Sequence, residues 1–293
     1  MLSYRHAFHA GNHADVLKHV VLVQLFRHLG LKEKPFWFID THAGAGAYDL
    51  DAPHARKLAE HRGGIGCLWT RPDLPAPVAD YVELVRRFNP DGRLRRYPGS
   101  PFLAWWTLRA QDRLRLFELH GSDARLLRKN FRDAGKRVIV ADTDGFAGLR
   151  ALLPPPPRRA VTLIDPSYER KQDYEQVVQT LRDALARFPD GVYAVWYPQL
   201  TRLDARELPR RLKRLSAGGW LHAALRVRAP SADGFGMHGS GLVVLNPPWT
   251  LHDTLADALP FLAEALREDD GADFILEAGP DVGNRETENG RPG

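Results

Sequence analysis

The sequence predicts an α/β protein with a doubly wound, mostly parallel sheet that carries helices on both faces. From residue 113 onward, short apolar runs of strand length alternate with amphipathic segments of helical length. Several of these apolar runs end in loops rich in glycine or acidic residues, as the strands of such sheets do. The composition, with 44% hydrophobic and 26% charged residues among 293, excludes a disordered chain, a collagen and a coiled coil.

The spacing of apolar residues predicts the helices and strands, and glycine and proline residues mark their ends. Apolar residues crowd one side of 13–30, which predicts a helix that Gly30 ends. The run KPFWFID at 34–40 lies behind Pro35 and predicts a buried strand. Further strands are predicted at 113–120, 136–142, 191–198, 221–228 and 239–248, and 160–168 is predicted as a strand that runs into a loop. Helices are predicted at 123–135, 145–153, 173–188 and 206–215.

Prolines interrupt the segment 50–110, where helical patches occur at 55–69 and 76–88 and another begins at Pro101. We interpret this segment as a helical insertion after the first core strand. The core is then formed by residues 1–49 and 111–278. Residues 279–293 are polar and rich in glycine, and we expect a flexible tail there.

The charge of the chain permits an anionic partner such as RNA without requiring one. Forty-one basic and 36 acidic residues give a net charge of +5 and a pI near 9.4. No run of 18 apolar residues occurs, and the His-rich start does not resemble a signal peptide, so we expect no membrane partner. The single cysteine, Cys67, cannot form an internal disulfide, which favours a cytoplasmic location.

Acidic and glycine residues follow the first three core strands. Gly44 and Gly46 form a short loop, but Asp49 stands where a dinucleotide fingerprint has its third glycine. At the next strand end, the Glu118 carboxylate can accept hydrogen bonds from both hydroxyls of a ribose. Asp144 follows the third strand, where it can accept from an adenine amino group. Although a single acid in such a place is usually just solvated, the combination predicts S-adenosylmethionine, with Gly44 and Gly46 among its contacts.

The fourth strand end carries the sequence Asp165-Pro166-Ser167-Tyr168, which resembles the Asp-Pro-Pro-Tyr motif of amino-methyltransferases. An adenine N6 is a poor nucleophile because its lone pair is delocalised into the ring. Two acceptors, the Asp165 carboxylate and the Pro166 carbonyl, would hold its two hydrogens and direct the lone pair at a methyl group. Tyr168 would stack on the base once the base is held out of its helix. These three residues are therefore the catalytic candidates.

The whole chain carries a more specific resemblance. The N-terminal MLSYRHAFHAGNHADVLKH is followed in order by DTHAGAG, YPGSP, ELH, DGF, IDPSYE, WYP and NPPW. Together, over roughly residues 1–250, these motifs resemble the RlmJ family of bacterial 23S rRNA adenine-N6 methyltransferases.

The resemblance implies a Rossmann-like methyltransferase sheet with a small helical insertion. It implies methyl transfer from S-adenosylmethionine to one adenine of protein-free 23S rRNA. By the same resemblance, the cofactor contacts fall on His19, His42, Ser100, Glu118, Asp144, Gly145 and Asp165, while Tyr4, His6 and Lys18 lie over the target pocket.

One residue departs from the family's motif, because Ser167 stands where proline is expected. Losing this proline frees one backbone angle and adds an N–H group, but it leaves the Asp165 and Pro166 acceptors in place. We expect activity to survive.

Other interpretations remain open at this point. The chain could methylate another amino-group substrate, or it could be a catalytically silent RNA-binding homologue in which Ser167 marks decay. The incomplete glycine pattern disfavours a dehydrogenase. The histidines of the first nineteen residues lack the spacing of metal ligands, so no metal is expected, and we expect a monomer. The segment 246–249 (NPPW) also fits an amino-methyltransferase pattern, but it follows the wrong strand and predicts a rigid turn.

Overall fold

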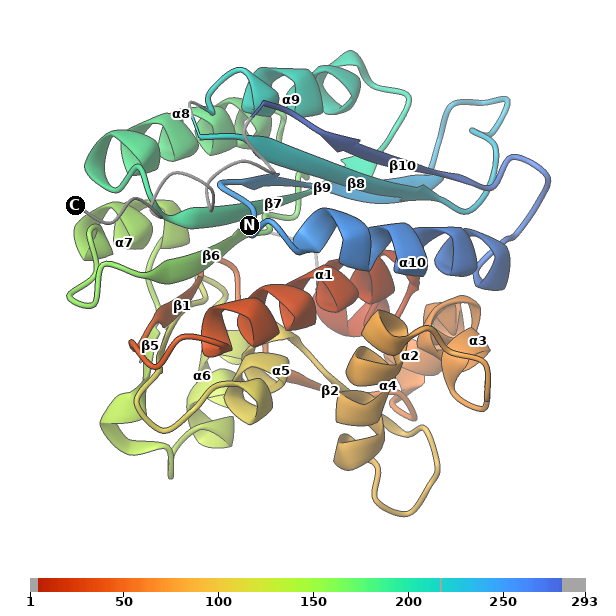
Figure 1. Cartoon of the computed structure of the whole chain (residues 1–293). Coiled ribbons are helices and arrows are strands. Elements are labelled where there is room, and N and C mark those ends of the chain that lie inside the picture. Colours follow the sequence, from red (N-terminus) through yellow and green to blue (C-terminus); the bar gives the residue numbers. More distant parts are fainter. Residues whose placement is uncertain (1–4, 217, 281–293) are drawn as a thin grey trace, which may run out of the picture.

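A computed structural model describes residues 5–216 and 218–280, which are built around one eight-stranded sheet. Its strands are β1 (Trp37–Asp40), β4 (Arg113–Phe117), β5 (Val138–Ala141), β6 (Ala160–Ile164), β7 (Val192–Gln199), β8 (Trp220–Arg226), β9 (Gly239–Leu245) and β10 (Asp273–Ala278). Their order in the sheet is β10-β8-β9-β7-β6-β1-β4-β5 (Figure 1).

The direction of the strands decides where a ligand can bind. Strands β7, β6, β1, β4 and β5 are parallel to one another, so their carboxyl ends meet at one edge of the sheet. Strands β9, β8 and β10 are joined to them by antiparallel pairing, so β9 ends at the opposite edge. The order changes direction around β1, where loops on either side leave a crevice. The predicted α/β fold with a mostly parallel sheet is confirmed.

Helices cover both faces of the sheet, as predicted (Figure 1). Their bounds are α1 (His13–Gly30), α2 (Pro53–Leu58), α3 (Ile65–Leu68), α4 (Ala76–Phe88), α5 (Ser100–Thr107), α6 (Gly121–Asn130), α7 (Gly145–Leu152), α8 (Lys171–Arg187), α9 (Leu203–Lys213) and α10 (Leu251–Ala265), with 3₁₀ turns η1 (His6–Phe8), η2 (Glu60–Gly63) and η3 (Gly135–Arg137). Side chains of α7, α8 and α9 share one apolar core, and those of α1, α4, α5 and α10 share the other.

The alternation of side chains along each strand explains why the sheet has an apolar core on each face. Successive strand residues point to opposite faces, so Phe38 joins the core under α1 whereas Ile39 joins the core under α8. Strand β9 is completely buried and alternates in the same way, with Leu242 and Val244 on one face and Val243 and Leu245 on the other. Near-continuous apolar runs are therefore needed, because both faces are covered.

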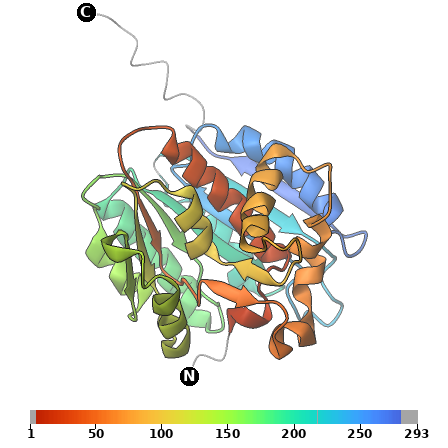
Figure 2. The ribbon, with the colours of Figure 1, turned by 90° about the horizontal axis from the view of Figure 1, so that it is seen from below.

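Helix α1 is buried along most of its length, between the sheet and the segment that contains α4 (Figure 2). The side chain of Asn12 caps its start by accepting hydrogen bonds from the N–H groups of Ala14 and Asp15, each at 3.0 Å. The apolar side chains of α1 pack against the sheet and against α4, α5 and α10. In the described ranges, no helix is long and apolar enough to cross a membrane.

The structure adds elements that the sequence analysis missed. Strands β2 (Ala47–Asp49) and β3 (Arg96–Pro98) form a small antiparallel sheet at the ends of the predicted insertion, and they are too short for a periodic signal. Helix α10 contains Pro260, and a proline inside a segment argues against a helix in the sequence. Strand β10 is a largely exposed edge strand. Helix α5, by contrast, matches the helical patch predicted to begin at Pro101, and it packs against α1, β1 and β4. The division into a core and an insertion stays a prediction, and of the predicted tail only residues 279 and 280 lie inside the described ranges.

Replacing Leu25 by alanine is expected to lower the free energy of unfolding by about 2–5 kcal/mol, because the change leaves a cavity where α1 packs in the core. Leu25 is fully buried there. The matched control is Leu31→Ala, at a leucine that is 76% exposed, which should change the value by less than about 0.5 kcal/mol. Urea unfolding followed by circular dichroism measures both, and equal effects would contradict this account of the core.

Candidate active site at the carboxyl ends of the central strands

A cavity of about 370 Å³ opens at the edge where the parallel strands end. Its volume lies in the range of small-ligand sites. Twelve of the predicted site residues line it: His6, Lys18, His19, His42, Gly44, Ser100, Glu118, Asp144, Gly145, Asp165, Pro166 and Tyr168. Tyr4 lies outside the described residues, and Gly46 does not line the cavity.

Gly44 and Gly46, the two glycines of the loop after β1, are explained by different contacts. A Cβ on Gly44 would lie 2.2 Å from the hydroxyl oxygen of Tyr48, and the residue has φ of 60°, so glycine suits both this backbone conformation and the close approach of Tyr48. Gly46 has φ of 77° and packs against α6, where a Cβ would lie 2.8 Å from the Leu127 side chain. Packing against α6 therefore accounts for Gly46.

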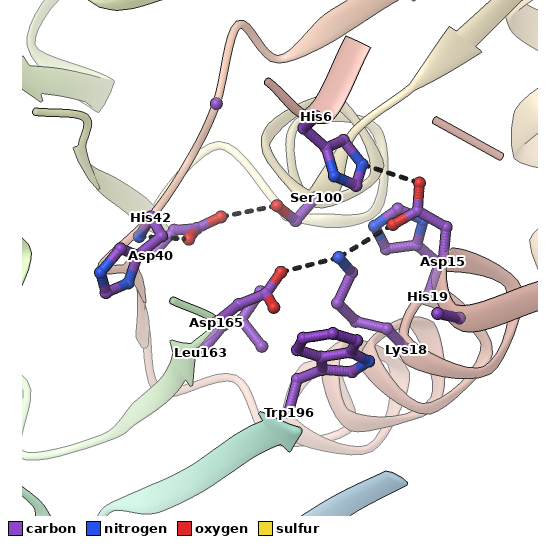
Figure 3. Close-up of polar contacts among 12 residues, drawn as sticks. His6, Asp15, Lys18, His19, Asp40, His42, Ser100, Leu163, Asp165 and Trp196 are labelled. Carbon is purple, nitrogen blue, oxygen red and sulfur yellow. Dashed lines mark hydrogen bonds and ion pairs between the residues drawn. The ribbon is translucent and has the colours of Figure 1, made fainter. Parts of the chain in front are cut away.

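A chain of buried ion pairs joins α1 to the end of β6 (Figure 3). The ammonium of Lys18 lies 2.7 Å from Asp165 Oδ2 and 2.8 Å from Asp15 Oδ1. The second oxygen of Asp15 contacts His6 Nε2 at 2.8 Å and accepts the N–H of Gly11 at 2.9 Å. Asp15 and Lys18 are buried, so these contacts act at low effective dielectric.

The environment sets the protonation of this chain. Burial would raise the pKa of Asp15, but nearby His6 and Lys18 outweigh it and hold the pKa well below its usual range. Burial opposes the charge of Lys18, yet the carboxylates of Asp15 and Asp165 raise its pKa well above the ordinary value. Burial also raises the pKa of Asp165, against the opposing effect of the Lys18 ammonium. Lys18 is therefore a permanent cation that orients both carboxylates.

Two acceptors at the end of β6 remain unused. Asp165 gives only its Oδ2 to Lys18. Within residues 5–216 and 218–280, neither Asp165 Oδ1 nor the Pro166 carbonyl accepts a hydrogen bond, and both residues line the cavity. Two neighbouring acceptors without donors at a cavity wall suit a ligand that brings two hydrogens, such as an amino group.

Aromatic side chains form the adjoining wall. Tyr168 adopts φ of 52°, donates its hydroxyl hydrogen to the Trp196 carbonyl at 2.7 Å, and packs its ring 4.6 Å from that of Tyr174. The left-handed backbone at Tyr168 turns the chain sharply after β6. Trp196 also lines the cavity, and its ring centroid lies 5.8 Å from Lys18 Nζ. The sequence analysis assigned no role to Trp196, although it belongs to the WYP motif.

The acids predicted to hold a nucleoside line the cavity, but they already have partners. Glu118 accepts the N–H of His120 at 2.7 Å and that of Gly44 at 2.8 Å, one at each carboxylate oxygen. Burial raises the pKa of Glu118, and these two bonds oppose the shift. Asp144 caps α7 through Oδ1, which accepts the Phe146 N–H at 2.8 Å. Each oxygen of Glu118, and Oδ2 of Asp144, still has lone pairs for a ligand.

Asp40 is another buried carboxyl group beside the cavity, and the sequence analysis assigned it no role. It accepts the hydroxyl hydrogen of Ser100 at 2.6 Å and the N–H of His42 at 3.1 Å (Figure 3). Burial is the main cause that raises its pKa to about 7, and those two bonds oppose the shift. Asp40 thus orients Ser100 and the loop of His42.

The residues that sequence reasoning missed are mostly partners of residues that it found. Asp15 precedes Lys18 by three positions and so shares its face of α1, which is the signal that could have identified it. Tyr48 and Trp196 reach the wall from β2 and β7, and no local pattern indicates this.

The second amino-methyltransferase-like pattern lies elsewhere. Asn246 follows β9, at the edge opposite the cavity, and has φ of 53°. Its side-chain amide donates to the carbonyls of Pro189 and Gly191, both at 2.7 Å, which makes it part of a structural turn. Among the residues described, no group of histidine, cysteine and acidic side chains could hold a metal ion.

The fold and the cavity define a Rossmann-like α/β enzyme whose ligand site lies at the carboxyl ends of the central parallel strands. Residues 33–275 match the family described as "Ribosomal RNA large subunit methyltransferase D, RlmJ". The chain belongs to this family, and the resemblance found in the sequence is confirmed.

Individual relatives agree with this membership. Proteins named Ribosomal RNA large subunit methyltransferase J from Haemophilus influenzae and Escherichia coli are each 46% identical to the chain, over 91% of it and 94% of their own length. A crystal structure of a Legionella pneumophila protein superposes with a TM-score of 0.85 at 36% identity. That superposition covers 93% of this chain and 99% of the Legionella chain.

The raised pKa of Asp40 predicts a pH-dependent stability. The folded carboxyl titrates near 7 instead of 3.8, so the folded chain binds more protons between these values and loses stability as pH rises through them. Relative to Asp40→Asn, which cannot titrate, the native chain is expected to lose roughly 4 kcal/mol from pH 4 to 8. Urea unfolding of both proteins across this range measures the difference, and parallel pH curves would contradict it.

Proposed function

We propose that this protein transfers the methyl group of S-adenosylmethionine to N6 of one adenine in protein-free 23S rRNA. The observation that carries the proposal is the pair of unused acceptors, Asp165 Oδ1 and the Pro166 carbonyl, at the wall of a cavity in an RlmJ-family fold. A primary amino group attached to a ring is the donor that satisfies both acceptors at once.

The residues of the cavity fit S-adenosylmethionine. Gly44 and Glu118 line the same part of the cavity, and Glu118 keeps lone pairs for ribose hydroxyls. Asp144 keeps Oδ2 for an adenine amino group, and His42, Gly145 and Ser100 complete that wall. When bound, the cofactor supplies an electrophilic methyl group on a sulfonium, whose positive charge suits a cavity lined by carboxylates.

The chain's own residues then activate the acceptor nitrogen. Asp165 Oδ1 and the Pro166 carbonyl accept the two N6 hydrogens, which favours a pyramidal nitrogen and directs its lone pair toward the methyl group. The Asp165 carboxylate stabilises the positive charge that develops on the nitrogen, and it can take the proton that the product must lose. Burial raises the pKa of Asp165, which makes it a better base for that last step.

Lys18 has a positioning role in this scheme. Its ammonium fixes Asp165 through Oδ2 and so aims Oδ1 at the substrate. Tyr168 and Trp196 supply flat surfaces beside these groups for a base that has left its stack. We place His6, which contacts Asp15 and lines the cavity, on the substrate side.

Exposed groups near the cavity suit a polynucleotide. On α6, Arg125 and Lys129 are exposed and form no ion pair with any other described residue, while Asp123 of the same helix lines the cavity. Their spacing of four residues places both cations on one face, where they can contact phosphates. We keep the monomeric state and the cytoplasmic location as predictions.

An exposed aromatic side chain lies close to the cavity. Phe235 is 79% exposed and stands two residues before Met237, which lines the cavity. Gly234 and Gly236 flank it with φ of 74° and 84°, and Thr201 donates its hydroxyl hydrogen to the Gly234 carbonyl at 2.7 Å. The loop therefore holds Phe235 outward, in a position to stack on an unpaired base of the RNA.

Asp165→Ala is expected to lower the rate of methyl transfer by a factor of about 10²–10⁴, because the variant loses one acceptor and the charge that stabilises the transition state. The measurement is transfer of labelled methyl from S-adenosylmethionine to protein-free 23S rRNA, with nucleoside analysis of the product. Asp253→Ala removes an exposed carboxylate that does not line the cavity, and it should retain the native rate.

The same assay tests the competing interpretations. N6-methyladenine formed by the native protein, and not by Asp165→Ala, is the expected result. Cofactor binding without transfer to 23S rRNA would overturn the proposal. It would favour a silent homologue or another amino-group substrate, and it would direct attention to Ser167.

Phe235→Ala is expected to raise KM for 23S rRNA roughly tenfold and to change KM for S-adenosylmethionine little, because stacking on one base contributes about 1–3 kcal/mol. Steady-state methyl transfer with each substrate varied measures both constants. Leu31→Ala, which removes a similarly exposed apolar side chain just after the end of α1, serves as the control. An unchanged KM for RNA would remove Phe235 from the docking surface.

A further inference from the structure

Two neutral histidines on the cavity wall each have one ring nitrogen bound by the protein. His19 Nδ1 lies 2.7 Å from the hydroxyl oxygen of Tyr97, which lies 2.9 Å from the hydroxyl oxygen of Tyr81. His42 Nδ1 lies 2.8 Å from the hydroxyl oxygen of Thr41. Among the described residues, neither histidine has a hydrogen-bond partner at Nε2. Both rings line the cavity, so Nε2 is the atom left for a ligand.

The hydroxyl hydrogens decide the tautomer of His19. Tyr81 and Tyr97 are fully buried, and within the described residues Tyr81 has no hydrogen-bond partner except Tyr97. If Tyr81 donates to Tyr97, and Tyr97 donates to His19 Nδ1, every hydrogen in the relay is used. If His19 donated from Nδ1 instead, one buried hydroxyl hydrogen would be unpaired, at a cost of about 1–3 kcal/mol. His19 therefore carries its hydrogen on Nε2.

A similar count gives the opposite result for His42. The Thr41 hydroxyl oxygen also lies 3.1 Å from the Leu163 carbonyl oxygen, which can only accept a hydrogen bond. Both contacts are hydrogen bonds only if Thr41 donates to Leu163 and accepts from His42 Nδ1–H. If Thr41 donated to His42, its oxygen and the carbonyl oxygen would face each other with no hydrogen between them. His42 therefore carries its hydrogen on Nδ1, which leaves a lone pair on Nε2.

We propose that the Tyr81–Tyr97 relay and Thr41 lock His19 and His42 in opposite tautomers, so that His19 presents a hydrogen-bond donor and His42 an acceptor to the cavity. Tyr81, Tyr97 and Thr41 are then positioning residues that act through the histidines. Figure 3 shows the two rings on opposite sides of the group formed by Ser100 and Asp165.

Burial keeps both rings neutral, which the arrangement requires. It lowers the pKa of His19 to about 3, with Lys18 adding to the shift and Asp15 opposing it. It lowers the pKa of His42 to about 4, against the opposing effect of Asp144. Neutral rings provide directional hydrogen bonds without placing positive charge beside a cationic ligand.

The consequence for the ligand rests on the proposed function. S-adenosylmethionine carries groups that only accept hydrogen bonds, such as its carboxylate, and groups that donate them, such as its ammonium and its ribose hydroxyls. A fixed donor on one wall and a fixed acceptor on the other favour a single orientation of such a molecule. Tyr81 lies on α4 and Tyr97 on β3, so the segment 50–110 contributes to this wall through His19.

Nitrogen-15 NMR of the imidazole rings tests the tautomers in the free protein, without any ligand. Long-range proton–nitrogen correlation spectra at pH 7 distinguish a protonated ring nitrogen from an unprotonated one. The expected pattern is Nε2–H for His19 and Nδ1–H for His42, with assignments from the signals that change in Tyr97→Phe and Thr41→Val. A protonated Nδ1 in His19, or the same tautomer in both residues, would overturn the proposal whatever the substrate is.

Cofactor affinity provides the second readout. In Tyr97→Phe, His19 loses the donor that fixes its tautomer, so the Kd for S-adenosylmethionine measured by calorimetry is expected to rise about three- to tenfold. Tyr193→Phe removes another fully buried hydroxyl, which donates to the carbonyls of Ala184 and Phe188 away from the cavity, and should leave this Kd unchanged. Thermal unfolding confirms that both variants fold.

The outcomes separate the two proposals. Equal Kd values for native protein and Tyr97→Phe would show that the relay does not act on the ligand. Absence of S-adenosylmethionine binding by the native protein, with the expected tautomers observed, would overturn the proposed function and leave the tautomer lock standing.

Discussion

The contact on which the rest of the site depends is the buried ammonium of Lys18 between the carboxylates of Asp15 and Asp165. It joins a helix near the start of the chain to a strand end about 150 residues later, and it fixes each by the charge of the other. Removing one partner of such a buried pair leaves an uncompensated charge, which typically costs about 3–5 kcal/mol. Helix α1 can hold Lys18 in this place because the helix is itself buried against the sheet and α5. The orientation of Asp165 is thus a property of the packed core as much as of its own loop.

Among the described residues that line the cavity, Lys18 and Arg170 are cations, six carry carboxyl groups, and burial keeps His19 and His42 neutral. This balance suits a ligand that carries positive charge at its reacting atom, because the acids attract it and the rings do not repel it. The carboxyl groups in and beside the cavity also form hydrogen bonds within the protein. Glu118 accepts two loop N–H groups, Asp144 caps α7 and Asp40 orients Ser100. A ligand therefore meets side chains whose directions are already fixed, which lowers the cost of ordering them on binding.

Much of this architecture could be predicted from the sequence, and the failures have physical causes. Helix α1 was predicted with its observed bounds because its apolar residues are numerous and Gly30 marks its end. The end of β4 was predicted too far along the chain, at residue 120 instead of Phe117, because the apolar Leu119 follows the strand. Strands β2 and β3 escaped prediction because three residues give no period, and β10 because an exposed edge strand lacks an apolar face.

The sequence by itself determined the alternation of strands and helices, the family, and the residues that follow the strands, because these depend on local period and on short motifs. Tertiary structure alone decided which partners those residues have. Folding pairs Asp165 with Lys18 and His19 with Tyr97. It also brings Thr41, which contacts His42, into hydrogen-bond contact with the carbonyl of Leu163. Protonation, tautomer and side-chain direction arise from burial and from hydrogen-bond partners distant in the chain, so they become defined only when the sheet and its helices are packed.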